Sequence, residues 1–73
     1  MGKVPILSGK EIVKILERHG YTSIRQNGSH IRLKPPDGRP EIKMVTVPLH
    51  KEVRTPLLKA ILRDAGIPLS SLE

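Results

Sequence analysis

The chain has 73 residues, which is enough for one small domain spanning residues 1–73 and leaves no room for a second. Hydrophobic residues make up 37% of it and Tyr21 is the single aromatic side chain, so the core must be aliphatic. The lack of other aromatics argues against proteins that read single-stranded nucleic acid by stacking bases on them. Thirteen Lys and Arg against seven Asp and Glu give a formal net charge of +6, which favours partners with phosphate backbones.

The absence of cysteine and the short apolar runs indicate the cellular compartment of the protein. Because there is no cysteine, disulfides and thiolate metal sites are excluded, which suits a reducing cytoplasm. No apolar run approaches the ~18 residues that a membrane span needs, and the N-terminus lacks the apolar stretch of a signal peptide. The sequence therefore predicts a cytoplasmic protein that does not enter a membrane.

The first predicted element is a helix that follows a short lead-in of residues 1–7. Ser8-Gly9-Lys10-Glu11 has the form of a capping box, and Gly20 suits the left-handed residue that ends a helix. Apolar residues recur with helical spacing along one stripe: Ile12, Val13, Ile15 and Leu16. His19 continues this stripe, so we expect a partly buried structural histidine there rather than a ligand.

A β-hairpin should follow, because Asn27-Gly28 is the strongest short-range signal for a two-residue type I′ turn. With these two residues as the loop, residues 21–26 pair with residues 29–34. Four cross-strand pairs are then expected: Gln26 with Ser29, Arg25 with His30, Ile24 with Ile31, and Thr22 with Leu33. One face would be apolar, and the other would carry four basic side chains: Arg25, His30, Arg32 and Lys34.

The second half of the chain predicts a third strand and a second helix. Residues 35–40 contain a Pro-Asp-Gly turn, residues 42–47 alternate as a strand does, and Pro48 should stop that strand. After a polar connection of residues 49–54, Thr55-Pro56 reads as the N-cap and first residue of a helix. Its apolar stripe is Leu58, Ile61, Leu62 and Ala65, and its C-terminal cap is Gly66. In the tail of residues 67–73, Leu69 and Leu72 are positioned to fold back on the core.

The predicted order is therefore helix, three-stranded antiparallel sheet, helix. This is an α+β fold in which both helices cover the apolar face of the sheet and leave the basic face open to solvent. Tyr21 is expected to close one edge of the core, although its hydroxyl could alternatively reach a phosphate.

The chemistry of the open face depends on His30. The three histidines are far apart in sequence and have no carboxylate at ligand spacing, so we expect neither a metal nor a small-molecule cofactor. Ser29 points to the other strand face and cannot be the nucleophile partner of His30. His30 is either an exposed strand histidine without a role or a general base beside a phosphate held by Arg25 and Arg32. A general base there would take the proton of an RNA 2′-hydroxyl.

Other candidates have simpler interpretations. His50 is a second acid–base group or, as we favour, a loop residue whose ring bonds to backbone. Three cations would extend the basic surface or simply be solvated, the latter being the default: Lys51, Arg54 and Lys59.

Four stretches give the chain a recognisable family pattern. They are Ser8-Gly9-Lys10-Glu11, Gly28-Ser29-His30, Val45-Thr46-Val47-Pro48-Leu49-His50, and the helix with its glycine cap from Leu57 to Ile67. In this order they resemble the HicA (YcfA-like) mRNA interferase toxins of toxin–antitoxin modules, over nearly the whole chain. One departure is visible: the family usually has Gly-Thr before the second helix, where this chain has Arg54-Thr55-Pro56. We expect the helix to survive this change, while the antitoxin contact or RNA path near Arg54 is altered.

The resemblance implies a double-stranded-RNA-binding-domain-like fold and the toxin of a type II toxin–antitoxin system. It further implies ribosome-independent cleavage of mRNA and tmRNA, neutralisation by a HicB-type antitoxin, and a catalytic histidine at His30. The residues expected to contact RNA are Arg25, Ser29, Arg32, Lys34 and His50. The alternative from another class is a non-catalytic RNA-binding module of the same fold, although Thr55-Pro56-Leu57-Leu58 lacks the lysine cluster that double-stranded-RNA binders place there. A basic protein–protein adaptor is a third alternative.

Overall fold

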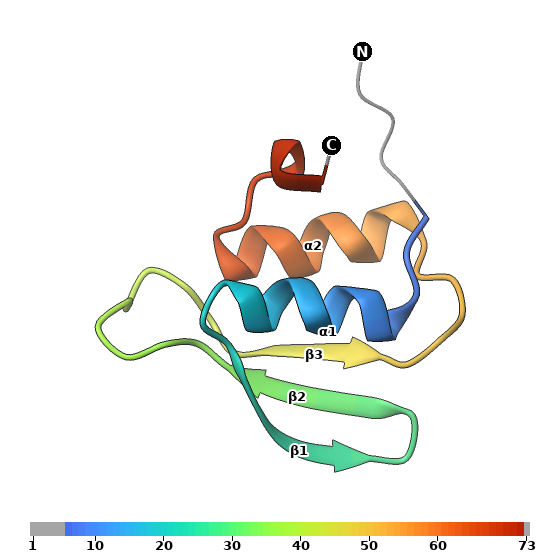
Figure 1. The fold of residues 1–73 in the computed structure, drawn as a ribbon, viewed down its shortest axis with the longest axis horizontal. Coiled ribbons are helices and arrows are strands. Elements are labelled where there is room, and N and C mark those ends of the chain that lie inside the picture. Colours follow the sequence, from blue (N-terminus) through green and yellow to red (C-terminus); the bar gives the residue numbers. More distant parts are fainter. Residues whose placement is uncertain (1–5, 73) are drawn as a thin grey trace.

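The computed structural model describes residues 6–72 and contains two α-helices over a three-stranded sheet (Figure 1). The elements are α1 (Gly9–Arg18), β1 (Thr22–Asn27), β2 (His30–Lys34), β3 (Val45–Pro48), α2 (Thr55–Ala65) and a short 3-10 helix η1 (Leu69–Leu72). The strands pair antiparallel in the order β1-β2-β3. This confirms the predicted α+β fold and its element order. The predictions for residues 1–5 and for Glu73 lie outside the described residues.

The capping box predicted at the start of α1 is present. The Glu11 N–H donates to Ser8 Oγ at 3.2 Å, and the Ser8 N–H donates to Glu11 Oε1 at 2.9 Å. Ile12 and Leu16 are fully buried, and Gly20 has the expected positive φ of 93°. The prediction for His19 is wrong, because this residue is exposed: the helix ends at Arg18 and the non-helical backbone of His19 carries it off the apolar stripe.

Helix α2 starts one residue earlier than predicted. Arg54, with extended backbone, is the N-cap, and Thr55 is already helical, so Thr55 is not the N-cap. Pro56 lies in the first turn, where its missing N–H costs no helical hydrogen bond. The predicted stripe of Leu58, Ile61, Leu62 and Ala65 is buried, and Gly66 ends the helix with φ of 69°. The helix therefore survives the departure from the family pattern.

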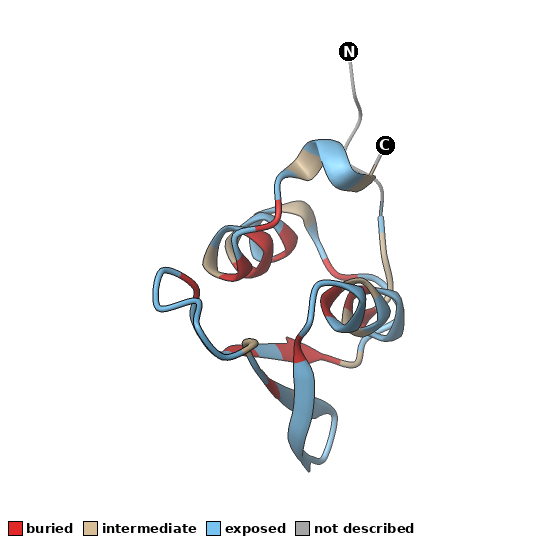
Figure 2. Ribbon diagram, turned by 60° about the vertical axis from the view of Figure 1, so that its left-hand side comes forward, coloured by how far each residue is buried: buried red, intermediate tan, exposed pale blue. Residues whose placement is uncertain are grey.

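The core lies between the two helices and the inner face of the sheet (Figure 2). Leu33, Val45 and Val47 contribute buried aliphatic side chains from the strands. Leu69 and Leu72 of η1 pack against this core as partly buried side chains, which confirms that the tail folds back. No helix among the described residues is long and apolar enough to cross a membrane.

Tyr21 closes the edge of the core, as predicted. Its side chain is 3% exposed and its hydroxyl donates to the backbone carbonyl of Lys43 at 2.6 Å. Burial raises the pKa of the Tyr21 hydroxyl, and the carboxylate of Asp64 adds to the rise. A hydroxyl committed to the backbone does not point to a phosphate, so the alternative role for Tyr21 is wrong.

The third strand is shorter than the predicted residues 42–47. The Ile42 N–H donates to the Arg39 carbonyl in a turn, and the Lys43 N–H donates to the Asp64 carbonyl of α2 at 2.9 Å. These donors are therefore not available to β2, and pairing with β2 begins only at Val45. Pro48 is the last residue of β3, in keeping with its predicted role of stopping the strand.

Candidate active site

The hairpin of β1 and β2 sets which side chains share the open face, and next to the turn its register differs by two residues from the prediction. Asn27 pairs with His30, Arg25 with Arg32, Gln26 with Ile31, and Thr22 with Lys34. The two loop residues are Gly28 and Ser29, not Asn27 and Gly28. Gly28 has φ of 62° and Ser29 does not have positive φ, which fits a type II′ turn and excludes type I′.

A shift of two residues leaves every side chain on its predicted face, so Arg25, His30 and Arg32 still share one face. An irregularity between Ser23 and Arg25 reduces the shift to one residue further along the strands. The extra residue, Ile24, has no partner in the ladder and is 47% exposed, so the predicted pairs of Ile24 with Ile31 and of Thr22 with Leu33 are wrong. A bulge of this kind re-aims the side chains on either side of it. Every residue of β1 is exposed, and β1 is an edge strand of the sheet.

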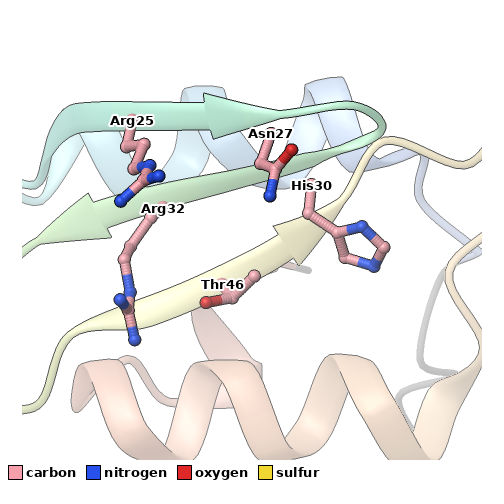
Figure 3. A pocket seen from close by; sticks show the side chains of 5 residues that line it. All are labelled: Arg25, Asn27, His30, Arg32 and Thr46. Atoms are coloured by element: carbon pink, nitrogen blue, oxygen red, sulfur yellow. The ribbon is translucent and has the colours of Figure 1, made fainter.

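A hollow of about 310 Å³ lies on the open face of the sheet (Figure 3). Its lining comes from all three strands: Arg25 and Asn27 from β1, His30 and Arg32 from β2, and Thr46 from β3. Two guanidinium groups therefore face one hollow that no carboxylate lines. The two positive charges repel each other, and a bound anion would reduce this repulsion. The hollow therefore suits a phosphate group.

The predicted RNA contacts divide into those that line the hollow and those that do not. Arg25, His30 and Arg32 are brought together, as expected for one strand face. Lys34 lines a different hollow, formed with the turn of residues 35–42. Ser29 is a turn residue whose carbonyl accepts a hydrogen bond from the Leu49 N–H at 2.6 Å, and it is not among the residues that line the hollow.

His50 lies beside His30. The two ring centroids are 6.4 Å apart and the ring planes are inclined by 69°. Both side chains are exposed. Within residues 6–72 the His50 ring makes no hydrogen bond to backbone, so the simpler interpretation of this residue as a ring-bonded loop residue is wrong.

Close backbone packing holds His50 in this place. The Gly9 N–H, at the start of α1, donates to the carbonyl of His50 at 2.9 Å. A Cβ on Gly9 would lie 2.1 Å from the Pro48 carbonyl oxygen and 2.7 Å from the Leu49 Cα. Only glycine allows the first turn of α1 to approach the end of β3 so closely. The glycine of the Ser8-Gly9 motif therefore has a role in positioning as well as in the helix.

Asn27 and Thr46 line the hollow but were not among the predicted site residues. Thr46 could have been found, because it alternates with Val45 and Val47 and so had to face away from the core. Asn27 could not, because its place on this face depends on which two residues form the turn. No group of three or more His, Cys, Asp or Glu side chains within the described part of the chain could hold a metal ion.

The fold and this hollow define a class: a small α+β domain with a basic, exposed sheet face and two exposed histidines at its end. The family model of the HicA toxin of bacterial toxin–antitoxin systems matches residues 9–67. The chain belongs to this family, and so is a HicA-type toxin for which the family implies a cognate antitoxin. Comparisons with curated proteins and with solved structures give no significant match.

Proposed function

We propose that this toxin is a metal-independent endoribonuclease that cleaves mRNA, with His30 as a general acid/base. The observation that carries the proposal is the hollow in which Arg25 and Arg32 face each other beside His30. Cleavage of RNA at a phosphodiester needs a base for the 2′-hydroxyl and cations for the developing charge. Both kinds of group meet on this face, which neither α1 nor α2 covers (Figure 2).

The proposed reaction begins with a phosphodiester that lies against His30 and is contacted by the two arginines. His30 takes the proton of the neighbouring 2′-hydroxyl, and the 2′-oxygen attacks phosphorus. The guanidinium groups stabilise the negative charge that grows on the non-bridging oxygens. Further contacts along the RNA backbone are proposed for Ser29, Lys34 and His50, which do not line the hollow themselves.

The proposed partner that silences the activity is a HicB-type antitoxin. An antitoxin that covers the hollow would have to match its positive charge with carboxylates or with a shape that excludes RNA. Arg54 stands where the family usually has a glycine, so we expect this residue to alter the antitoxin contact or the path of the RNA.

The deciding experiment compares His30→Ala with the parent on folded mRNA, in the presence of a chelator. The parent should cleave the RNA and slow growth when expressed without antitoxin, and the variant should lose activity by roughly 100-fold or more, the usual contribution of a general acid/base. His19→Ala is the matched control, because His19 is an exposed histidine at the C-terminus of α1, outside the hollow. Binding by the parent without any cleavage product would favour a non-catalytic RNA-binding module. No binding even at low salt would favour an adaptor.

A further inference from the structure

We propose that His50 is the second acid–base group of this site and gives its proton to the 5′-oxygen that leaves when RNA is cut. The inference rests on the proposed ribonuclease function and adds a catalytic residue to it. The observation behind it is the pairing of His30 and His50 at 6.4 Å between ring centroids.

The two histidines reach this position from different parts of the fold. His30 is the first residue of β2, directly after the turn, and His50 follows β3 by two residues. Two contacts join these segments to each other, and a third holds His50 against α1. His30 pairs with Pro48 in the sheet, the Leu49 N–H donates to the Ser29 carbonyl, and the Gly9 N–H donates to the His50 carbonyl. Backbone contacts therefore fix both Cα positions, while both rings stay exposed to a substrate.

The spacing suits one phosphate between the rings. A catalytic side chain must lie within ~3 Å of the oxygen whose proton it moves. Rings with centroids 6.4 Å apart are too far apart to be committed to a mutual hydrogen bond, and close enough that both can reach oxygens of the same phosphodiester. The arginines lie along the same face, at the pair next to Asn27 and His30, where they can contact the non-bridging oxygens.

The step balances with two histidines and no other reactant. His30, neutral, accepts the 2′-hydroxyl proton as the bond from the 2′-oxygen to phosphorus forms. His50, protonated, donates a proton to the 5′-oxygen as the bond from phosphorus to that oxygen breaks. The products are a 2′,3′-cyclic phosphate and a 5′-hydroxyl, and proton exchange with water restores both rings. Histidine suits both roles because it can exist in either form near neutral pH.

The test uses an RNA that the parent cleaves, prepared with oxygen or with sulfur at the bridging 5′ position of the cleaved linkage. Sulfur leaves as a thiolate without needing a proton, because thiols are much stronger acids than alcohols. His50→Ala should cut the oxygen substrate roughly 100-fold or more slowly than the parent, the usual contribution of a general acid, and cut the sulfur substrate at close to the parent rate. His30→Ala should be slow on both substrates, and the control His19→Ala should match the parent on both.

Each other outcome overturns the inference. If His50→Ala cuts the oxygen substrate as fast as the parent, or is slowed equally on both substrates, His50 is not the proton donor. Rescue of His30→Ala instead of His50→Ala would reverse the two roles and contradict the assignment. If the parent cleaves no RNA from which such a pair of substrates could be prepared, the proposed ribonuclease function fails together with the inference. The His50→Ala variant should fold, because the hydrogen bond that anchors His50 uses its backbone carbonyl and not its side chain. Its thermal unfolding and its affinity for an uncleavable 2′-deoxy substrate check this.

Discussion

Asn27 and His30 lie directly opposite each other across the β1–β2 hairpin, and Arg25 and Arg32 form the next pair on the same face. The cross-strand neighbour of His30 is therefore a neutral asparagine instead of Arg25. The two guanidinium groups face each other two residues further along. Asn27 therefore lies between the histidine and the two arginines that carry the positive charge of the hollow (Figure 3).

Asn27→Asp tests this arrangement. A carboxylate at this position would repel the phosphate and occupy the arginines, so we expect RNA affinity to fall about tenfold at low salt, a change of ~1.4 kcal/mol. Ser23→Asp is the matched control, because it adds the same charge to β1 opposite Leu33, a residue buried on the helix side of the sheet. Affinities measured by titration of a labelled RNA decide the point. Equal weakening by the two variants would show that only net charge matters.

Arg25→Gln and Arg32→Gln should each reduce the salt dependence of RNA binding. Each arginine that contacts a phosphate releases counterions, so each variant should lower the slope of log affinity against log salt by about 0.7. Lys14→Gln, an exposed lysine on α1, removes the same charge away from the sheet face and should leave the slope nearly unchanged. Titrations at several salt concentrations supply the slopes. A common change in all three variants would argue against a localised phosphate site.

Gly28→Ala should impair the site by straining the β1–β2 turn, without any steric clash. A Cβ on Gly28 meets nothing within 4 Å, so its cost is only the strain of a φ of 62°, about 1–2 kcal/mol. Gly38→Ala is a close control, since Gly38 also has positive φ and an open surrounding. Both variants should unfold at lower urea concentration by similar amounts. Only Gly28→Ala should also lower RNA cleavage under conditions where the protein is folded, because only this turn sets the register of Asn27 against His30.

The sequence was sufficient for features that depend on local chemistry. The capping box of Ser8 and Glu11, the stripe of α2 and the left-handed Gly66 all follow from residue type and spacing, and all are present. The register of the hairpin was not predictable in this way. Gly28 supplies positive φ in either of two adjacent loops, which differ by two residues in register at the turn, and the bulge at Ile24 leaves a difference of one residue further along the strands.

The contact between His30 and His50 could not be predicted from local sequence patterns either. Twenty residues separate His30 from His50. Their contact depends on tertiary packing of the segment after β3 against the start of α1, which the close approach of Gly9 allows. A pattern of sequence spacing carries no information on such a contact. Which basic residues share the face was predictable, since alternation along β2 requires it, but which of them are paired was not.

Tyr21→Phe should remove a stability loss at alkaline pH. Because the pKa of Tyr21 is raised in the folded protein, its contribution is fully present below the unfolded value near 10 and is lost as pH rises through the folded value. The parent should therefore lose more stability than the variant above pH ~10. At pH 7 the variant should be less stable by about 1 kcal/mol, because the Lys43 carbonyl loses its hydrogen bond. Urea unfolding at neutral and alkaline pH checks both signs, and parallel curves for the two proteins would contradict them.

Gly9→Ala should disturb both stability and the position of His50. The added Cβ would lie 2.1 Å from the Pro48 carbonyl oxygen, and because this atom belongs to backbone the strand end must move. We expect a loss of about 1–3 kcal/mol in the free energy of unfolding, as for other overpacked sites. Ser8→Ala is the control at the neighbouring position: it loses the capping hydrogen bond, worth ~1 kcal/mol, and leaves the contact of Gly9 with β3 intact. Under folding conditions Gly9→Ala should slow cleavage of ordinary RNA more than cleavage of the 5′-sulfur substrate, since a displaced His50 is a poorer proton donor. Equal slowing of both substrates would mean that the helix contact serves stability only.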